Sequence, residues 1–83
     1  MKITVDLSMY PLDADYKAPI KAFIRRLREY GELELVTNQM STQIRGEHEA
    51  VMNAVSQTLR ASADSFGAQM LVCKFYPGEL DID

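Results

Sequence analysis

The sequence is poor in several residue types, and each shortage excludes a class of protein. Cys73 is the only cysteine among 83 residues, so neither an internal disulfide nor a Cys-x-x-Cys metal or redox pair can form. No apolar run approaches the roughly 18 residues that a membrane span needs. Twelve acidic residues against nine basic ones leave a net charge of −3. This balance argues against a protein whose task is to hold nucleic acid phosphates.

The residues that are present have the composition of one small globular domain. Hydrophobic residues make up 47% and charged residues 25%, which is typical of folded rather than disordered chains. A lone thiol is typical of a reducing compartment, and Asp6 interrupts the N-terminus too early for a signal peptide. We therefore expect a single domain over residues 1–83, no membrane partner and a cytoplasmic location. Its core is thin, so self-association or a bound ligand would add stability.

Alternation of apolar and polar residues predicts four strands. The first, residues 2–10, has Ile3, Val5, Leu7 and Met9 on one face and a polar face made of Thr4, Asp6, Ser8 and Tyr10. The others are expected at residues 33–37, 40–45 and 68–76. Asn38 and Gln39 form the predicted turn between the second and third strands, and Gly46 is expected to end the third.

Two helices are expected between these strands. The first should follow an N-cap at Asp13 or Asp15, carry Pro19 near its first turn and end at a C′ glycine, Gly31. Its apolar stripe consists of Ile20, Phe23, Ile24 and Leu27. The second helix should open with acidic residues in its first turn and end near residues 64–67. Its predicted buried stripe consists of Val51, Met52, Val55 and Leu59.

The resulting order, β-α-β-β-α-β, predicts an α+β fold of the ferredoxin-like type. Right-handed crossovers give a four-stranded antiparallel sheet with both helices on one face and the first and third strands in the middle. The second sheet face then has no helix to cover it. Residues 78–83 form a short acidic tail for which the pattern predicts no structure.

Several functions of this architecture are excluded by the sequence. An RNA-binding version needs basic and aromatic residues on the central strands, where this chain has Asp6, Ser8, Ser41 and Gln43. A soft-metal carrier needs two cysteines, and an acylphosphatase-like enzyme needs an arginine in the loop after the first strand, where residues 9–13 have none. His48 is the only histidine and has no nucleophile spaced to work with it. We therefore expect a protein that is not an enzyme and has no cofactor.

Three segments resemble a known family. They are LSMYPL at residues 7–12, VTNQMSTQIRGE at 36–47 and VM at 51–52, and they closely resemble the YkoF-like thiamine- and hydroxymethylpyrimidine-binding proteins. The single-domain thiamine-binding-protein family is similar in order and length. The resemblance covers the chain to about Tyr76 and implies a unit that binds the pyrimidine moiety of thiamine without catalysing a reaction. YkoF-like chains carry two such units in tandem, so this single unit is expected to form a homodimer or homotetramer.

The polar face of the first strand supplies the candidate ligand residues. Asp6 would accept a hydrogen bond from an aminopyrimidine, or else be solvated or paired with Lys74. Tyr10 would stack on a flat ring or only close the strand, and Thr37, Met40 and Thr42 would contact ligand or only serve packing. We expect Ser41 and Gln43 alongside Asp6 on the third strand. The full set of predicted ligand-binding residues is Asp6, Ser8, Tyr10, Thr37, Met40, Ser41, Thr42 and Gln43.

The open sheet face also suggests a second kind of function. Met70 and Val72 would lie exposed there in a monomer, which favours a contact between subunits over a solvated surface. The alternative to a binding protein is therefore a structural or regulatory interaction module whose open face serves only self-assembly.

Overall fold

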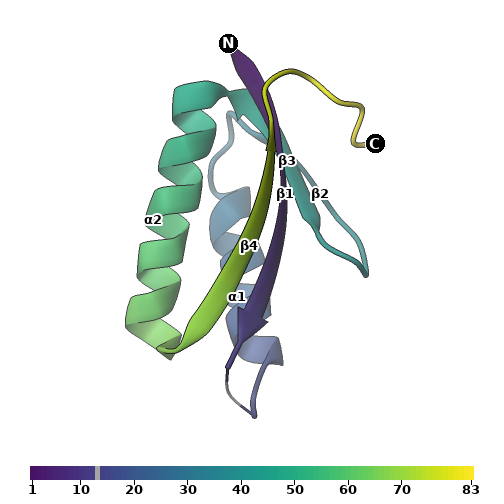
Figure 1. Cartoon of the computed structure of the whole chain (residues 1–83). Coiled ribbons are helices and arrows are strands. Elements are labelled where there is room, and N and C mark those ends of the chain that lie inside the picture. The colour runs from purple at the N-terminus through teal and green to yellow at the C-terminus, as the bar shows by residue number, and fades with distance from the viewer. Residues whose placement is uncertain (13) are drawn as a thin grey trace.

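The chain forms one four-stranded antiparallel sheet with two helices packed on the same face (Figure 1). The computed structural model describes residues 1–12 and 14–83. Its elements are β1 (Lys2–Pro11), α1 (Lys17–Arg28), β2 (Glu34–Thr37), β3 (Thr42–Glu47), α2 (His48–Phe66) and β4 (Gln69–Tyr76). The strand order across the sheet is β2-β3-β1-β4. The predicted ferredoxin-like α+β fold is confirmed, with β1 and β3 in the middle.

The alternation of β1 decides which side of the sheet becomes the core. Ile3, Val5 and Leu7 are buried beneath the helices, and the even-numbered residues of β1 face the other way. From α1 the core receives Phe23 and Leu27, two members of the predicted stripe. The remaining buried apolar residues are Ile44, Val51, Ala54 and Val55.

The buried stripe of α2 differs from the predicted one. Val51 and Val55 are buried as expected, but Met52 and Leu59 are 41% and 37% exposed. The helix instead turns small side chains inward, at Ala54, Thr58 and Ser62. Small residues allow close approach of α2 to its neighbours, and this moves the larger Met52 and Leu59 to the flank of the helix. In the described part of the chain, neither helix is long and apolar enough to cross a membrane.

The predicted caps of α1 were wrong. The helix follows Tyr16, which makes no side-chain capping bond, so Asp15 is not the N-cap, and Asp13 lies outside the described residues. At the other end, α1 stops too early for Gly31 to be its C′ residue, and Gly31 does not have a positive φ. Pro19 does lie in the first turn, as predicted.

The prediction for β3 was shifted along the chain. Gly46, expected to end the strand, lies inside it opposite Ile3 and is buried. A Cβ at Gly46 would lie 2.7 Å from Cδ2 of Leu33, so this glycine permits close packing rather than breaking the strand. Met40, expected on the strand, lies in the loop before it and is 88% exposed.

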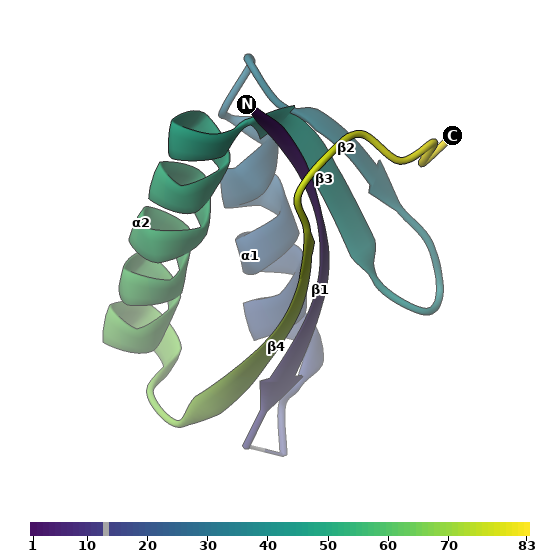
Figure 2. The same ribbon diagram turned by 45° about the horizontal axis from the view of Figure 1, so that its top comes forward.

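The C-terminal residues return across the sheet face that carries no helix (Figure 2). The hydroxyl of Thr4 donates to the carbonyl of Gly78 at 2.9 Å and accepts the N–H of Leu80 at 3.0 Å. The guanidinium of Arg45 donates to the carbonyl of Leu80 at 2.6 Å. Thr4 is only 5% exposed as a result. The tail, for which no structure was predicted, thus covers part of the face that was expected to be open.

Candidate functional site

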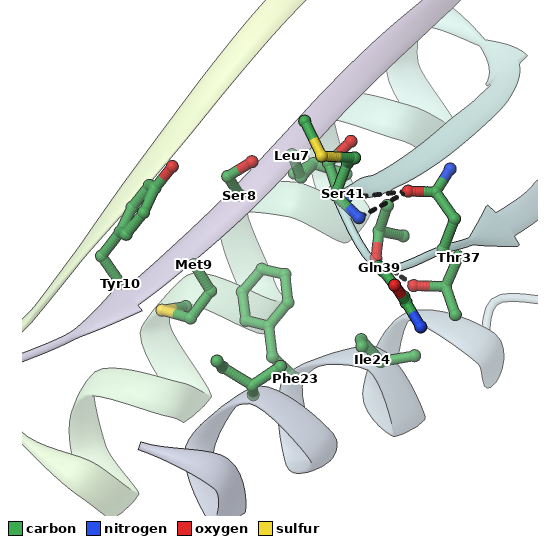
Figure 3. Close-up of a pocket in the computed structure, with 13 residues that line it drawn as sticks. Leu7, Ser8, Met9, Tyr10, Phe23, Ile24, Thr37, Gln39 and Ser41 are labelled. Atoms are coloured by element: carbon green, nitrogen blue, oxygen red, sulfur yellow. Dashed lines mark hydrogen bonds between the residues drawn. The ribbon is translucent and has the colours of Figure 1, made fainter. Parts of the chain in front are cut away.

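A cavity lies where β1 extends past the end of β3. Residues from Lys2 to Leu7 of β1 pair with β3, whereas β4 follows β1 to its last residue, Pro11. The end of β1 therefore has no strand on its β3 side. A cavity of about 170 Å³ occupies this place, between the β2–β3 loop and α1 (Figure 3).

The cavity has an apolar side and a polar side, which come from different elements. The apolar side chains come from β1 and α1 and are Leu7, Met9, Ile20, Phe23 and Ile24. The polar residues come mainly from the β2–β3 hairpin and are Ser8, Thr37, Asn38, Gln39, Ser41 and Thr42. Figure 3 shows the labelled Phe23 and Ile24 below the strand, with Thr37, Gln39 and Ser41 to one side. An apolar wall with a few placed polar groups is the usual character of a small-molecule site.

Hydrogen bonds fix the shape of the hairpin loop that forms the polar side. The side-chain oxygen of Asn38 accepts the N–H groups of Met40 at 2.8 Å and Ser41 at 3.0 Å, and the N–H of Asn38 donates to the carbonyl of Ser41 at 3.0 Å. Across the two strands, the hydroxyls of Thr37 and Thr42 lie 2.5 Å apart. The loop is therefore ordered by its own side chains rather than by a two-residue turn.

On the opposite side of Ser41 lies a network centred on Asp6. The hydroxyl of Ser41 donates to Oδ1 of Asp6 at 2.5 Å, and the amide of Gln43 donates to the same oxygen at 2.8 Å. The bond from Ser41, followed by the bond from Gln43 and the positive charge of Lys74, lowers the pKa of Asp6, although partial burial opposes the shift. Ser41 and Gln43 lie alongside Asp6, as the sequence predicted. The carboxylate already has two partners within the chain.

The predicted site residues divide between two cavities. Six of them line the cavity at the end of β1: Ser8, Tyr10, Thr37, Met40, Ser41 and Thr42. Asp6 and Gln43 line a second cavity, of about 460 Å³, on the sheet face without helices. Asp6 and Gln43 line the second cavity because their side chains lie on the sheet face that carries no helix. Ser41 connects the two groups.

The second cavity lies between the sheet and the C-terminal tail. Besides Asp6 and Gln43 it is lined by Lys74 and Tyr76 of β4 and by tail residues 80–83. Lys74 lies directly opposite Asp6 on the neighbouring strand, so the predicted alternative partner of this carboxylate is also close to it.

Sequence reasoning missed the α1 wall of the first cavity and also Asn38 and Gln39. Ile20, Phe23 and Ile24 had been identified only as a core stripe, because periodicity shows that a residue is turned inward but not whether packing against it is complete. Asn38 could have been found from its tendency to accept hydrogen bonds from the N–H groups two and three residues later. Cys73 is half-buried against the core, and burial raises the pKa of its thiol.

Comparison with known proteins gives a match in structure only. No protein-family model matches the sequence, and no curated protein is significantly similar to it. Solved structures do match over nearly the whole chain. A Thermotoga maritima protein provisionally assigned to thiamine biosynthesis or salvage superposes with a TM-score of 0.85 at 21% identity, covering 99% of this chain and 91% of that one.

Two further solved structures have the same arrangement. A hypothetical protein from Methanocaldococcus jannascii has a TM-score of 0.81 at 20% identity, over 94% of this chain and 81% of that one. A domain of unknown function, DUF77, from Bacillus cereus has a TM-score of 0.81 at 18% identity, over 100% and 85%. The chain shares their fold. At these identities the similarity extends to the fold alone, so function must be argued from the cavities.

Proposed function

We propose that this protein binds the hydroxymethylpyrimidine moiety of thiamine, free or within thiamine, without catalysing a reaction, and that it acts as a homo-oligomer. The observation that carries the proposal is the cavity at the end of β1, which is lined by six of the eight residues that the sequence selected. Two similarities support the proposal. Residues 7–12 and 36–47 resemble thiamine-binding proteins, and the structurally similar T. maritima protein has a thiamine-related assignment.

The size and lining of the cavity suit one flat heterocycle. Its volume of about 170 Å³ is below the roughly 300–1,000 Å³ of sites for drug-sized ligands, so one ring is a better fit than two. Phe23 and Ile24 offer an apolar surface to the ring face, while Thr37 offers a hydroxyl to its edge. Tyr10, at the end of β1, is 54% exposed, and its side chain points away from Phe23 and Ile24 (Figure 3), so it can contact only a part of the ligand that extends past the strand.

The proposal is tested by a thermal shift with hydroxymethylpyrimidine and with thiamine, followed by calorimetric titration. A ligand at 100 times its Kd stabilises the native state by about 2.7 kcal/mol. For a domain of this length we expect the Tm to rise by roughly 10 °C or more. Adenine, a flat heterocycle with two fused rings, is the control and should give a smaller shift. An unchanged Tm with both pyrimidine ligands at millimolar concentration would contradict the proposal.

We place the self-association at β4, which is an unprotected edge of the sheet. The opposite edge, β2, is only four residues long and has Glu34 paired with Arg45. β4 is eight residues long, contains one charged residue, and exposes apolar side chains on both faces, namely Met70, Val72, Phe75 and Tyr76. Long apolar edges tend to pair with another strand. The β4 strand of a second copy of this chain can pair with this edge, so no other protein is required.

An antiparallel pair of β4 strands centred on Cys73 is self-complementary. The N–H of Leu12 bonds the carbonyl of Ala68. By alternation, the main-chain groups of even-numbered residues in β4 face β1 and those of odd-numbered residues, Cys73 among them, face outward. In this register Val72 lies opposite the partner's Lys74. The outward-facing N–H and C=O groups of the two β4 strands can then pair with each other and join the two sheets into one.

Two variants of Val72 test this assembly. Val72→Lys places like charges opposite each other twice in the pair, whereas Val72→Glu places opposite charges there. We expect the dimer dissociation constants of the two variants to differ by roughly tenfold or more in sedimentation, with Val72→Lys the weaker. Equal weakening by both would contradict the Cys73-centred register. A wild-type sample containing only a 9.4 kDa species at micromolar concentration would contradict self-association itself.

The exposed β4 edge also favours the second candidate, a module that serves only self-assembly. The ligand titration separates the two functions. A dimer that binds neither hydroxymethylpyrimidine nor thiamine would support this second candidate.

A further inference from the structure

The main-chain groups of β1 alternate between its two neighbouring strands. The N–H of His48 donates to the carbonyl of Met1 at 2.8 Å, and in the β1–β3 register these two residues are directly opposite. Odd-numbered residues of β1 therefore direct their N–H and C=O toward β3. The bond from the Leu12 N–H to the Ala68 carbonyl, at 3.0 Å, shows by the same rule that even-numbered residues face β4. The two observations agree.

Met9 is the first odd-numbered residue beyond the end of β3. Leu7, the odd-numbered residue before it, is still paired with Thr42. Continuing the register would place Met40 opposite Met9, but Met40 lies in the loop, is 88% exposed and gives its N–H to Asn38. Within residues 1–12 and 14–83, neither the N–H nor the C=O of Met9 has a hydrogen-bond partner on this side. Met9 is nevertheless one of the residues that line the cavity.

A half-buried peptide group without a partner is a site for a complementary ligand. The N–H and C=O of one strand residue point the same way and stand side by side, so together they present one donor and one acceptor. Leaving such groups unsatisfied costs on the order of 1–3 kcal/mol each. A molecule that fills the cavity recovers this energy only if its edge has an acceptor next to a donor.

We infer that the main chain of Met9 recognises the edge of the bound ring. Its N–H donates to a ring nitrogen, and its C=O accepts from the adjacent exocyclic amino group. The ligand class is thus an amino-substituted heterocycle with donor and acceptor side by side, as in a 4-aminopyrimidine. This inference rests on the proposed function, because it concerns the same cavity. It assigns recognition to backbone atoms, whereas the sequence had assigned it to the carboxylate of Asp6.

Amide hydrogen exchange on the wild-type protein tests the inference without any substitution. With saturating hydroxymethylpyrimidine we expect exchange of the Met9 amide to slow by about tenfold or more. The amides of Ser8 and Tyr10 face β4 and are the matched controls, so their exchange should change much less. Binding accompanied by an unchanged Met9 amide would overturn the inference while leaving the proposed function intact. Absence of binding would overturn both.

A ligand analogue and a variant provide a second test. Replacing the amino group of the pyrimidine by hydrogen removes the donor to the Met9 carbonyl and should weaken binding roughly tenfold or more. Met9→Pro removes the N–H that faces the cavity and also replaces a side chain that packs against the core, and proline is tolerated where a strand lacks a neighbour. We expect a similar loss with Met9→Pro and nearly wild-type binding with Met9→Leu. If the analogue binds as tightly as hydroxymethylpyrimidine, the inference is wrong, whether or not Met9→Pro folds.

Discussion

Ile24→Trp is expected to abolish binding of hydroxymethylpyrimidine while the protein remains folded. Ile24 is half-buried on α1 and forms the apolar wall of the cavity beneath the hairpin (Figure 3). An indole at this position would occupy much of a space of about 170 Å³. Because the site is open to solvent on one side, the added ring can enter the cavity rather than force the core apart. We expect affinity to fall by roughly a hundredfold or more, since the ring loses its apolar contacts.

The matched control is Lys21→Trp, on the exposed side of the same helix. It adds the same indole outside the cavity and should leave the affinity within about threefold of wild type. This corresponds to a change in binding free energy well under about 1.4 kcal/mol. Circular dichroism melts of both variants verify that the fold is retained. Wild-type affinity in a folded Ile24→Trp protein would show that the ligand binds elsewhere, with the cavity beneath the C-terminal tail as the next candidate.

Asp6→Asn is expected to lower the stability of the ligand-free protein and also to weaken binding. The carboxylate accepts bonds from Ser41 and Gln43, and bonds to a charged group contribute about 1.5–3 kcal/mol against about 0.5–1.5 for neutral pairs. Asparagine can keep the geometry but loses the charge. A loss of about 1–3 kcal/mol corresponds to a decrease in Tm of several degrees or more.

The effect on binding is indirect, because Asp6 lies on the sheet face away from the first cavity. Through its bond to the hydroxyl of Ser41 it holds the β2–β3 loop, and residue Ser41 of this loop lines that cavity. A less firmly held Ser41 should reduce affinity roughly tenfold, the equivalent of one hydrogen bond to a charged group. Ser41→Ala removes the same bond, from the side of its donor. The double variant should therefore bind about as weakly as Ser41→Ala alone, and additive losses would contradict the positioning role.

The stability contribution of Asp6 depends on pH in a defined direction. Its pKa is lowered in the folded state by the bonds from Ser41 and Gln43, so the folded protein binds its proton less readily than the unfolded chain. The contribution is therefore complete above the unfolded pKa of about 3.9 and is lost as the pH falls through the lower folded pKa. The difference in Tm between wild type and Asp6→Asn should narrow at acid pH. A difference that stays constant below pH of about 4 would contradict this assignment, and Asp64→Asn, at an exposed carboxylate, is the control.

Periodicity in the sequence was enough to determine the fold and the faces of its strands. The alternation at residues 2–10 separated Ile3, Val5 and Leu7 from the polar face, because successive side chains of a strand point to opposite sides. The spacing of Phe23 and Leu27 marked the inner face of α1 for a similar reason. These features are local, so one sequence is sufficient to reveal them. The expected placement of Ser41 and Gln43 beside Asp6 was also correct.

Tertiary structure decided where the strands stop relative to one another, and this decided the site. In the β1–β3 register, Lys2 pairs with Glu47 and Leu7 with Thr42, the first residue of β3. Beyond Leu7 the strand β1 has no neighbour on this side, which creates the cavity and leaves the peptide of Met9 directed into it. No local pattern encodes a register between residues so far apart in the chain. The same long-range contacts turned Gly46 into a packing position and drew the tail over Thr4. The residue types of the site could be read from the sequence, but its backbone donor and acceptor required the assembled sheet.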